Sequence, residues 1–182
     1  PHPVQKHVPV LNAAASSEGR QFAMRNADFL FTPVFDFEQA KATVSDVREK
    51  AAAVGRDVGV FTFSTVVCRP TRREAEDYLD YYANQNADWE AVDYLMKLQG
   101  MHAQSFTPEA LANFRDRFAA GHGGFPLVGT PDHIADQLEK LSDTGLAGTT
   151  LAFVDYAEEF PYFRDEVIPR LERKGLRSPS GD

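Results

Sequence analysis

The sequence of 182 residues has little cysteine, no long apolar run and no excess of positive charge. Its one cysteine, Cys68, excludes an internal disulfide and a zinc site built from several cysteines. No apolar stretch approaches the ~20 residues of a membrane-spanning helix, and no stretch has the pattern of a secretory signal. The formal net charge is −8, and the only basic cluster is Arg69–Arg73. We therefore expect a cytoplasmic protein with no membrane or nucleic-acid partner.

Several catalytic and binding motifs are also missing. The sequence contains no HExxH, no GxGxxG, no P-loop and no metal-ligand cluster, so we expect no bound metal. With 43% hydrophobic and 25% charged residues, the composition fits one globular domain over residues 1–182 or part of a larger one. Residues 1–7, which do not begin with Met, have the composition of a linker, and residues 176–182 that of a frayed tail. We expect the chain to be a fragment of a longer protein.

Strand and helix patterns alternate along the chain. We expect strands at 8–14, 28–32, 58–68 and 149–154, and helices at 18–27, 37–54, 71–84, 88–101, 107–120, 131–144 and 157–174, the last disturbed at Pro169. The helix at 37–54 shows an apolar stripe of Ala40, Val44, Val47, Ala51 and Val54. Asp36 with Gln39, and Thr71 with Glu74, have the spacing of capping boxes that open the helices at 37–54 and 71–84. Strands that alternate with helices indicate an α/β fold with a parallel sheet. Four βα units fit either a small open sheet or half of an eight-stranded barrel.

The segment Val8–Arg20, VPVLNAAASSEGR, is typical of a strand that leads directly into a helix N-terminus. The free N–H groups of a first helical turn and the helix dipole favour a phosphate at such a corner. The alternative is an ordinary serine N-cap. If a phosphate binds, the Glu18 side chain must point away, and Arg20 is expected to be a solvated helix residue.

The chain resembles the C-terminal half of the bacterial luciferase-like, flavin-dependent monooxygenases. The pyrimidine-ring-opening and dialkyl-sulfone branches are nearer than the alkanesulfonate branch. The resemblance rests on the order and spacing of four segments: AAASSEGRQFAMRNADFLFT (13–32), AVGRDVGVFTFSTVVCRPTRREAEDY (53–78), GHGGFPLVGTPDHIADQLEKL (121–141) and LAFVDYAEEFPYFRDEVIPRLERKGLR (151–177).

The resemblance implies a (β/α)₈ TIM barrel, of which this chain would supply the last four βα units. Chemistry in such barrels takes place at the C-terminal ends of the strands. A helical insertion at 85–125 interrupts the pattern before the last helix–strand pair, and we expect it to cover the mouth as a lid. A covered mouth would exclude water from the reaction.

The resemblance also implies the cofactor and its partners. Ala15, Ser16 and Ser17 match the loop that binds the FMN phosphate. A separate flavin reductase would supply reduced FMN, and the enzyme would be a homo-oligomer. One oxygen atom of O₂ would enter a small organic substrate, either a pyrimidine-like heterocycle or a sulfone.

Three further residues match family positions near the flavin or substrate. Tyr156 matches a tyrosine that could hydrogen-bond a reacting oxygen. His122, in the turn GHGG, stands where the alkanesulfonate branch has an arginine. Thr65 stands where that branch has a histidine, and this difference argues against a sulfonate substrate. For each of the three, a plain structural role is the alternative.

Other charged residues have plain expected roles. Asp155 is expected to be the N-cap of the helix at 157–174, and Glu159 to be a solvated helix charge. Arg69 is expected to flank a helix start.

Two other functions remain open from the sequence. The same fold could use a deazaflavin for hydride transfer as an oxidoreductase. A half-barrel could also bind flavin or phosphate without catalysis.

Overall fold

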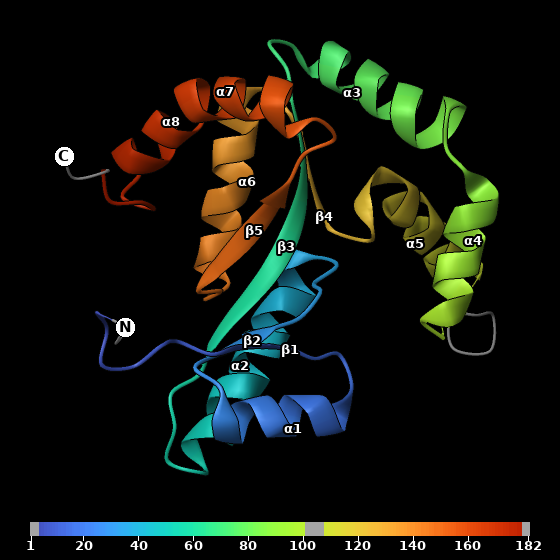
Figure 1. The fold of residues 1–182 in the computed structure, drawn as a ribbon. Helices are drawn as coiled ribbons and strands as arrows, with labels where there is room; N and C mark the ends of the chain where they lie inside the picture. Colours follow the sequence, from blue (N-terminus) through green and yellow to red (C-terminus); the bar gives the residue numbers. More distant parts are fainter. Residues whose placement is uncertain (1–3, 101–107, 180–182) are drawn as a thin grey trace. The chain divides into compact units, whose positions relative to one another are not determined.

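The computed structural model describes residues 4–100 and 108–179. The predicted end of the helix at 88–101 and the predicted start of the helix at 107–120 lie outside the described residues. Strands and helices alternate through most of the chain (Figure 1). The elements are β1 Leu11–Ala13, α1 Ser17–Asn26, β2 Phe29–Phe31, α2 Phe37–Ala52, β3 Gly59–Cys68, α3 Arg72–Asp80, η1 Tyr81–Gln85, α4 Trp89–Leu98, α5 Pro108–Gly121, β4 Phe125–Gly129, α6 Pro131–Asp143, β5 Gly148–Ala152, α7 Tyr156–Glu166 and α8 Ile168–Arg173.

The chain divides into two compact units. The first unit holds residues 1–63 and 140–150, and the second holds residues 64–139 and 151–182. Strands β3 and β5 and helix α6 each contribute residues to both units. In the part of the chain that the structure describes, no helix is long and apolar enough to cross a membrane.

The first unit contains parallel strands paired in sequence order. β1 pairs with β2, and β2 pairs with the first residues of β3. Helix α2 buries Ala40, Val44, Val47 and Ala51 as the stripe predicts. Val54 does not belong to this face, because α2 ends at Ala52 and Val54 is exposed. The parallel α/β arrangement predicted from the sequence is confirmed.

In the second unit, the later residues of β3 pair in parallel with β4, from Ser64 with Phe125 to Cys68 with Gly129. The sequence analysis missed β4. Its five residues, FPLVG, include a proline and a glycine, and proline seldom occurs inside a strand. Pro126 is nevertheless a member of the ladder, opposite Thr65.

In the second unit, one helix begins where it is predicted to begin, and two predicted helices are interrupted. Thr71 and Glu74 form a capping box at the start of α3, where the predicted helix begins. That helix does not continue regularly to residue 84, because residues Tyr81–Gln85 form a π-helix, η1. The last predicted helix is divided at Val167 into α7 and α8, with Pro169 in the first turn of α8.

Candidate functional site

The first candidate region is the corner between β1 and α1, which we call the serine corner and define as Ala15, Ser16 and Ser17. All three residues are exposed. Ser16 is the N-cap of α1, and its Oγ accepts a hydrogen bond from the Gly19 N–H over 3.1 Å. The capping alternative is therefore correct for Ser16, while Ser17 begins the helix with its side chain next to a cavity.

This cavity has a volume of about 270 Å³. It is lined by Ala15, Ser17, Arg20, Gln21, Met24, Asp46 and Lys50. Arg20 is half-buried rather than solvated as expected, and its Nη2 donates to Thr32 Oγ1 over 3.3 Å. Among the described residues, the buried Nε of Arg20 has no hydrogen-bond partner. The Lys50 ammonium is paired with the Asp46 carboxylate over 2.7 Å, so these two lining charges offset each other. The Ser17 hydroxyl and the Arg20 guanidinium, beside the N-terminus of α1, are the groups of this cavity that suit an anion.

Glu18 does not point away from the corner. Its pKa is lowered, because its own backbone N–H and the Ser17 and Ser16 hydroxyls hydrogen-bond the carboxylate. The carboxylate thus occupies the electropositive start of α1, where an acidic side chain is favourable. The expectation that Glu18 points away applies to a bound phosphate, and an anion at the corner would compete with this carboxylate.

The second candidate region is a cavity of about 250 Å³ in the second unit, which we call the Thr65 cavity. Its lining is Thr65, Val66, Tyr82, Ala119, Ala120, Gly121, Ala152, Phe153 and Val154. None of these side chains carries a charge at neutral pH. Thr65 is 6% exposed, and its hydroxyl is the polar group that β3 contributes to the cavity.

One wall of the Thr65 cavity is the turn Gly121–Gly124, here called the glycine turn. Gly121, His122 and Gly123 all have positive φ angles, of 154°, 55° and 83°. A Cβ at Gly121 would lie 2.1 Å from Thr65 Cγ2, so only glycine fits between the turn and β3. His122 occupies the left-handed region, which histidine enters more readily than most residues.

The structure brings His122 close to the Thr65 cavity without placing it in the lining. Its ring lies 5.2 Å from that of Phe118, and its Nε2 lies 3.2 Å from Gln99 Nε2. Tyr156 is likewise outside the lining. It is 59% exposed, its ring lies 5.5 Å from the lining residue Phe153, and its hydroxyl donates to the Leu151 carbonyl over 3.4 Å.

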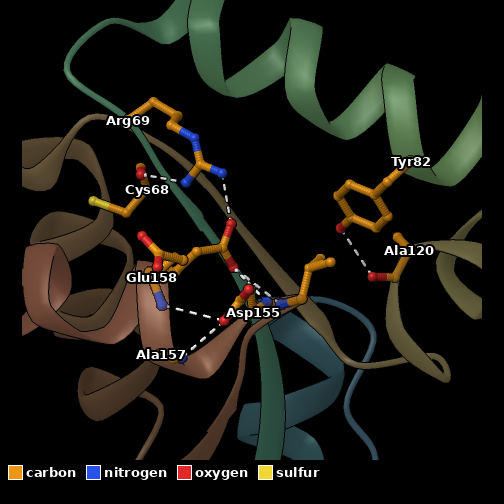
Figure 2. A network of polar contacts seen from close by, with 9 residues as sticks. Cys68, Arg69, Tyr82, Ala120, Asp155, Ala157 and Glu158 are labelled. Carbon is orange, nitrogen blue, oxygen red and sulfur yellow. Dashed lines mark hydrogen bonds and ion pairs between the residues drawn. The ribbon is translucent and has the colours of Figure 1, made fainter.

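A buried ion pair supports the opposite wall, at Phe153 and Val154. Arg69 Nη2 lies 2.5 Å from Glu159 Oε1, and the Arg69 guanidinium stacks 4.0 Å above the Tyr78 ring. The other Glu159 oxygen accepts from the backbone N–H groups of Val154 and Asp155, over 3.0 and 3.3 Å. Figure 2 shows Arg69 reaching from the end of β3 toward the Asp155 loop.

Sequence reasoning missed this pair. Glu159 is expected there to be a solvated helix charge, yet it is only 8% exposed. Arg69 is expected merely to flank a helix start. The neighbouring residue Asp155 does what its position predicts and caps α7, accepting from the N–H groups of Ala157 and Glu158 (Figure 2). The sequence held no signal for the ion pair, because its members are 90 residues apart.

Tyr82 is the other residue that the sequence did not indicate. Its hydroxyl donates to the Ala120 carbonyl over 2.9 Å (Figure 2). Burial raises the pKa of Tyr82 to about 12, so the phenol stays protonated and remains a donor at neutral pH. The second unit therefore contains a cavity with an uncharged lining that includes the hydroxyl-bearing residues Thr65 and Tyr82. The first unit contains the exposed serine corner beside Arg20.

Comparisons with known proteins identify the family of the chain. Residues 1–148 match the family described as luciferase-like monooxygenase. The chain is 29% identical to a dimethyl-sulfide monooxygenase of Hyphomicrobium sulfonivorans, over 98% of this chain and 44% of the relative. It is 31% identical to an FMNH(2)-dependent dimethylsulfone monooxygenase of Pseudomonas putida, over 93% of this chain and 48% of that protein. The crystal structure of DmoA from H. sulfonivorans superposes with a TM-score of 0.78 at 25% identity, covering 94% of this chain and 42% of that one.

The parallel sheet and its alternating helices make this chain one of the α/β proteins. Within that class, the chain belongs to the luciferase-like monooxygenase family. The chain spans a little under half the length of the curated relatives it matches.

Proposed function

We propose that this chain is the C-terminal half of a (β/α)₈ barrel in a monooxygenase that uses reduced FMN. The enzyme would transfer one oxygen atom of O₂ to a small, neutral organic molecule such as a sulfone or a pyrimidine-like heterocycle. Family membership supports the reaction class, and the named activities of two relatives support FMN and a sulfur-containing acceptor. The single observation that carries the proposal is the serine corner together with the Arg20 donor that lacks a partner.

Reduced FMN, when bound, supplies the activation of O₂, and a separate flavin reductase would deliver it. The residues of this chain would bind and orient. Ser17 and Arg20 would hold the phosphate at the N-terminus of α1. The Thr65 hydroxyl would donate a hydrogen bond to an acceptor oxygen, and the apolar lining would exclude water.

The uncharged lining favours a neutral acceptor. A sulfonate would enter the Thr65 cavity without a counter-ion, and an unpaired charge costs much free energy when it leaves water. The proposed role of Tyr156 and His122 is to border the cavity, where the glycine turn and the β5–α7 loop present them. The insertion at 85–125 would serve as the lid.

A titration of FMN against the complete protein tests the phosphate assignment. Ser17→Ala combined with Arg20→Gln is expected to weaken FMN binding roughly 10- to 100-fold, because hydrogen bonds to a charged group are lost. Riboflavin, which has no phosphate, is expected to bind equally to both proteins. Arg25→Gln, at the other end of α1, is the control and is expected to change neither ligand's affinity.

Ser16 needs its own control, because it caps α1. Ser16→Ala is compared with Asp36→Ala, which removes the corresponding cap from α2. Equal effects of Ser17→Ala/Arg20→Gln on FMN and riboflavin would contradict the phosphate assignment. Product formation that does not consume O₂ would point instead to the deazaflavin-type oxidoreductase.

A further inference from the structure

Tyr82 joins two segments that are far apart in the sequence. It lies in the π-helix η1, and it donates its hydroxyl hydrogen to the carbonyl of Ala120, near the end of α5 (Figure 2). Carbonyl groups in the last turn of a helix have no partner within the helix, so Tyr82 satisfies a group that would otherwise need water. Single-turn π-helices are often found at functional sites. Tyr82 and Ala120 both line the Thr65 cavity.

The residue after Ala120 is Gly121, which packs directly against Thr65. The space between them is too small for one added carbon, since a Cβ would come within 2.1 Å of Thr65 Cγ2. Gly121, His122 and Gly123 have positive φ angles, so α5 cannot continue through them. Ladder pairing with β3 begins only at Phe125, after the turn. The turn's own bonds run from the His122 N–H to the Phe118 carbonyl and from the Gly123 N–H to the Arg117 carbonyl. These bonds are internal to the α5 end, whereas the Tyr82 bond joins that end to η1.

We propose that Tyr82 is a positioning residue that holds the Ala120–Gly121 wall against β3 and thereby limits the size of the acceptor that the Thr65 cavity takes. The part of this inference that concerns the acceptor rests on the proposed function. The part that concerns the wall does not.

The test compares two matched variants in the full protein. Tyr82→Phe removes the bond to Ala120 and keeps the ring in the cavity lining. Tyr81→Phe makes the same chemical change one residue earlier in η1, where the side chain is exposed. Because the substitution is isosteric apart from one oxygen, both variants are expected to fold, and far-ultraviolet circular dichroism checks this.

Amide hydrogen exchange measures how often the glycine turn opens locally, and it needs no ligand. Tyr82→Phe is expected to speed exchange at the His122, Gly123 and Gly124 amides about fivefold, the equivalent of one net hydrogen bond. Tyr81→Phe is expected to leave these rates unchanged. Equal rates in the two variants would overturn the proposal.

Steady-state kinetics measure the consequence for the acceptor, with dimethyl sulfone and di-n-propyl sulfone as probes. In Tyr82→Phe the KM for dimethyl sulfone is expected to rise about fivefold with kcat within twofold of the parent, since a looser wall weakens binding of a small acceptor. The ratio of kcat/KM for the larger sulfone over the smaller is expected to rise. An unchanged ratio would overturn the size-limiting role.

The two proposals can fail separately. If the parent protein oxidises neither sulfone, the sulfone part of the proposed function fails, and the exchange rates still decide whether Tyr82 holds the wall. If the parent is active and Tyr82→Phe matches Tyr81→Phe in both measurements, the role of Tyr82 is overturned and the proposed function stands.

Discussion

The serine corner and the Thr65 cavity are built in opposite ways. The corner is exposed, and its defining bond joins Ser16 to Gly19, three residues apart. The cavity is bounded by contacts between distant residues, with Tyr82 and Ala120 separated by 38 positions and Arg69 and Glu159 by 90. A local arrangement can bind a phosphate with backbone N–H groups and few side chains. Selecting the shape of a neutral molecule requires walls that only the tertiary fold can bring together.

The largest effect is expected from Glu159→Ala, which tests whether the contact between distant residues beside the Thr65 cavity stabilises the fold. Removing one partner of a buried ion pair leaves Arg69 unpaired and frees the Val154 and Asp155 N–H groups. The expected loss is about 3 kcal/mol in the free energy of unfolding, at the lower end for buried pairs because Arg69 is partly exposed. Urea unfolding measures the loss, and amide exchange at Val154 and Asp155 locates it.

Glu158→Ala is the matched control, because the neighbouring carboxylate is exposed. It is expected to change stability by less than about 0.5 kcal/mol. Equal losses in the two variants would show that Glu159 acts as an ordinary surface charge, and the contrast between the two regions would then be lost.

A smaller effect is expected from closing the gap between the glycine turn and β3. Gly121→Ala places a methyl group against Thr65 Cγ2 in a backbone conformation that L-residues rarely adopt. Overpacking and the positive φ together are expected to cost about 2 kcal/mol in the free energy of unfolding. Thr65→Ser removes the clashing methyl group, so the double variant is expected to recover part of the loss.

The double-mutant cycle of Gly121→Ala and Thr65→Ser is read by thermal or urea unfolding. A coupling of about 1 kcal/mol or more, favouring the double variant, confirms direct contact between the turn and β3. If the free-energy changes of the two substitutions are strictly additive, the glycine turn accommodates the added methyl group by moving away from β3. The position of the turn would then not depend on Thr65.

The same contrast explains which features the sequence predicted. The caps at Asp36, Thr71 and Asp155 are local and were predicted correctly, because each side chain bonds an N–H two or three residues ahead. Glu159 is also an acidic residue in the first turn of a helix, but its partner Arg69 is 90 residues away, so its burial was not predicted. Strand β4 was missed because Pro126 contradicts the usual strand pattern and only its pairing with β3 explains it.

The parallel α/β architecture was predicted from the alternation of strand and helix patterns, and the family from the order of four weak segments. Thr65 was identified through the family resemblance alone, and nothing in its neighbours in the chain reveals that Gly121 packs against it. The roles of Tyr156, His122 and the serine corner stay predictions until ligand binding is measured.

The smallest effect is expected from Glu18 and tests whether the serine corner binds a phosphate. Because its carboxylate occupies the start of α1, Glu18 would repel a phosphate at the serine corner. Glu18→Gln removes that repulsion and is expected to tighten FMN binding about threefold. Glu38→Gln, which makes the same change in the first turn of α2, is the control and is expected to have no effect.

The pH dependence of this effect follows from the direction of the pKa shift. Hydrogen bonds to the Glu18 carboxylate lower its pKa from the usual value of 4.5, so the group stays charged at every pH above that value. Between pH 8 and about pH 5 the Glu18 carboxylate keeps its charge, while the FMN phosphate loses one of its two negative charges at about pH 6. The free-energy advantage of Glu18→Gln over the parent protein is therefore expected to fall by about half through that range, because the phosphate charge falls from about −2 to about −1. It should disappear only as the pH falls through the lowered pKa of Glu18, where the parent carboxyl takes up a proton. An advantage that is lost completely between pH 7 and pH 6 would show that Glu18 is not the carboxylate that competes with the phosphate.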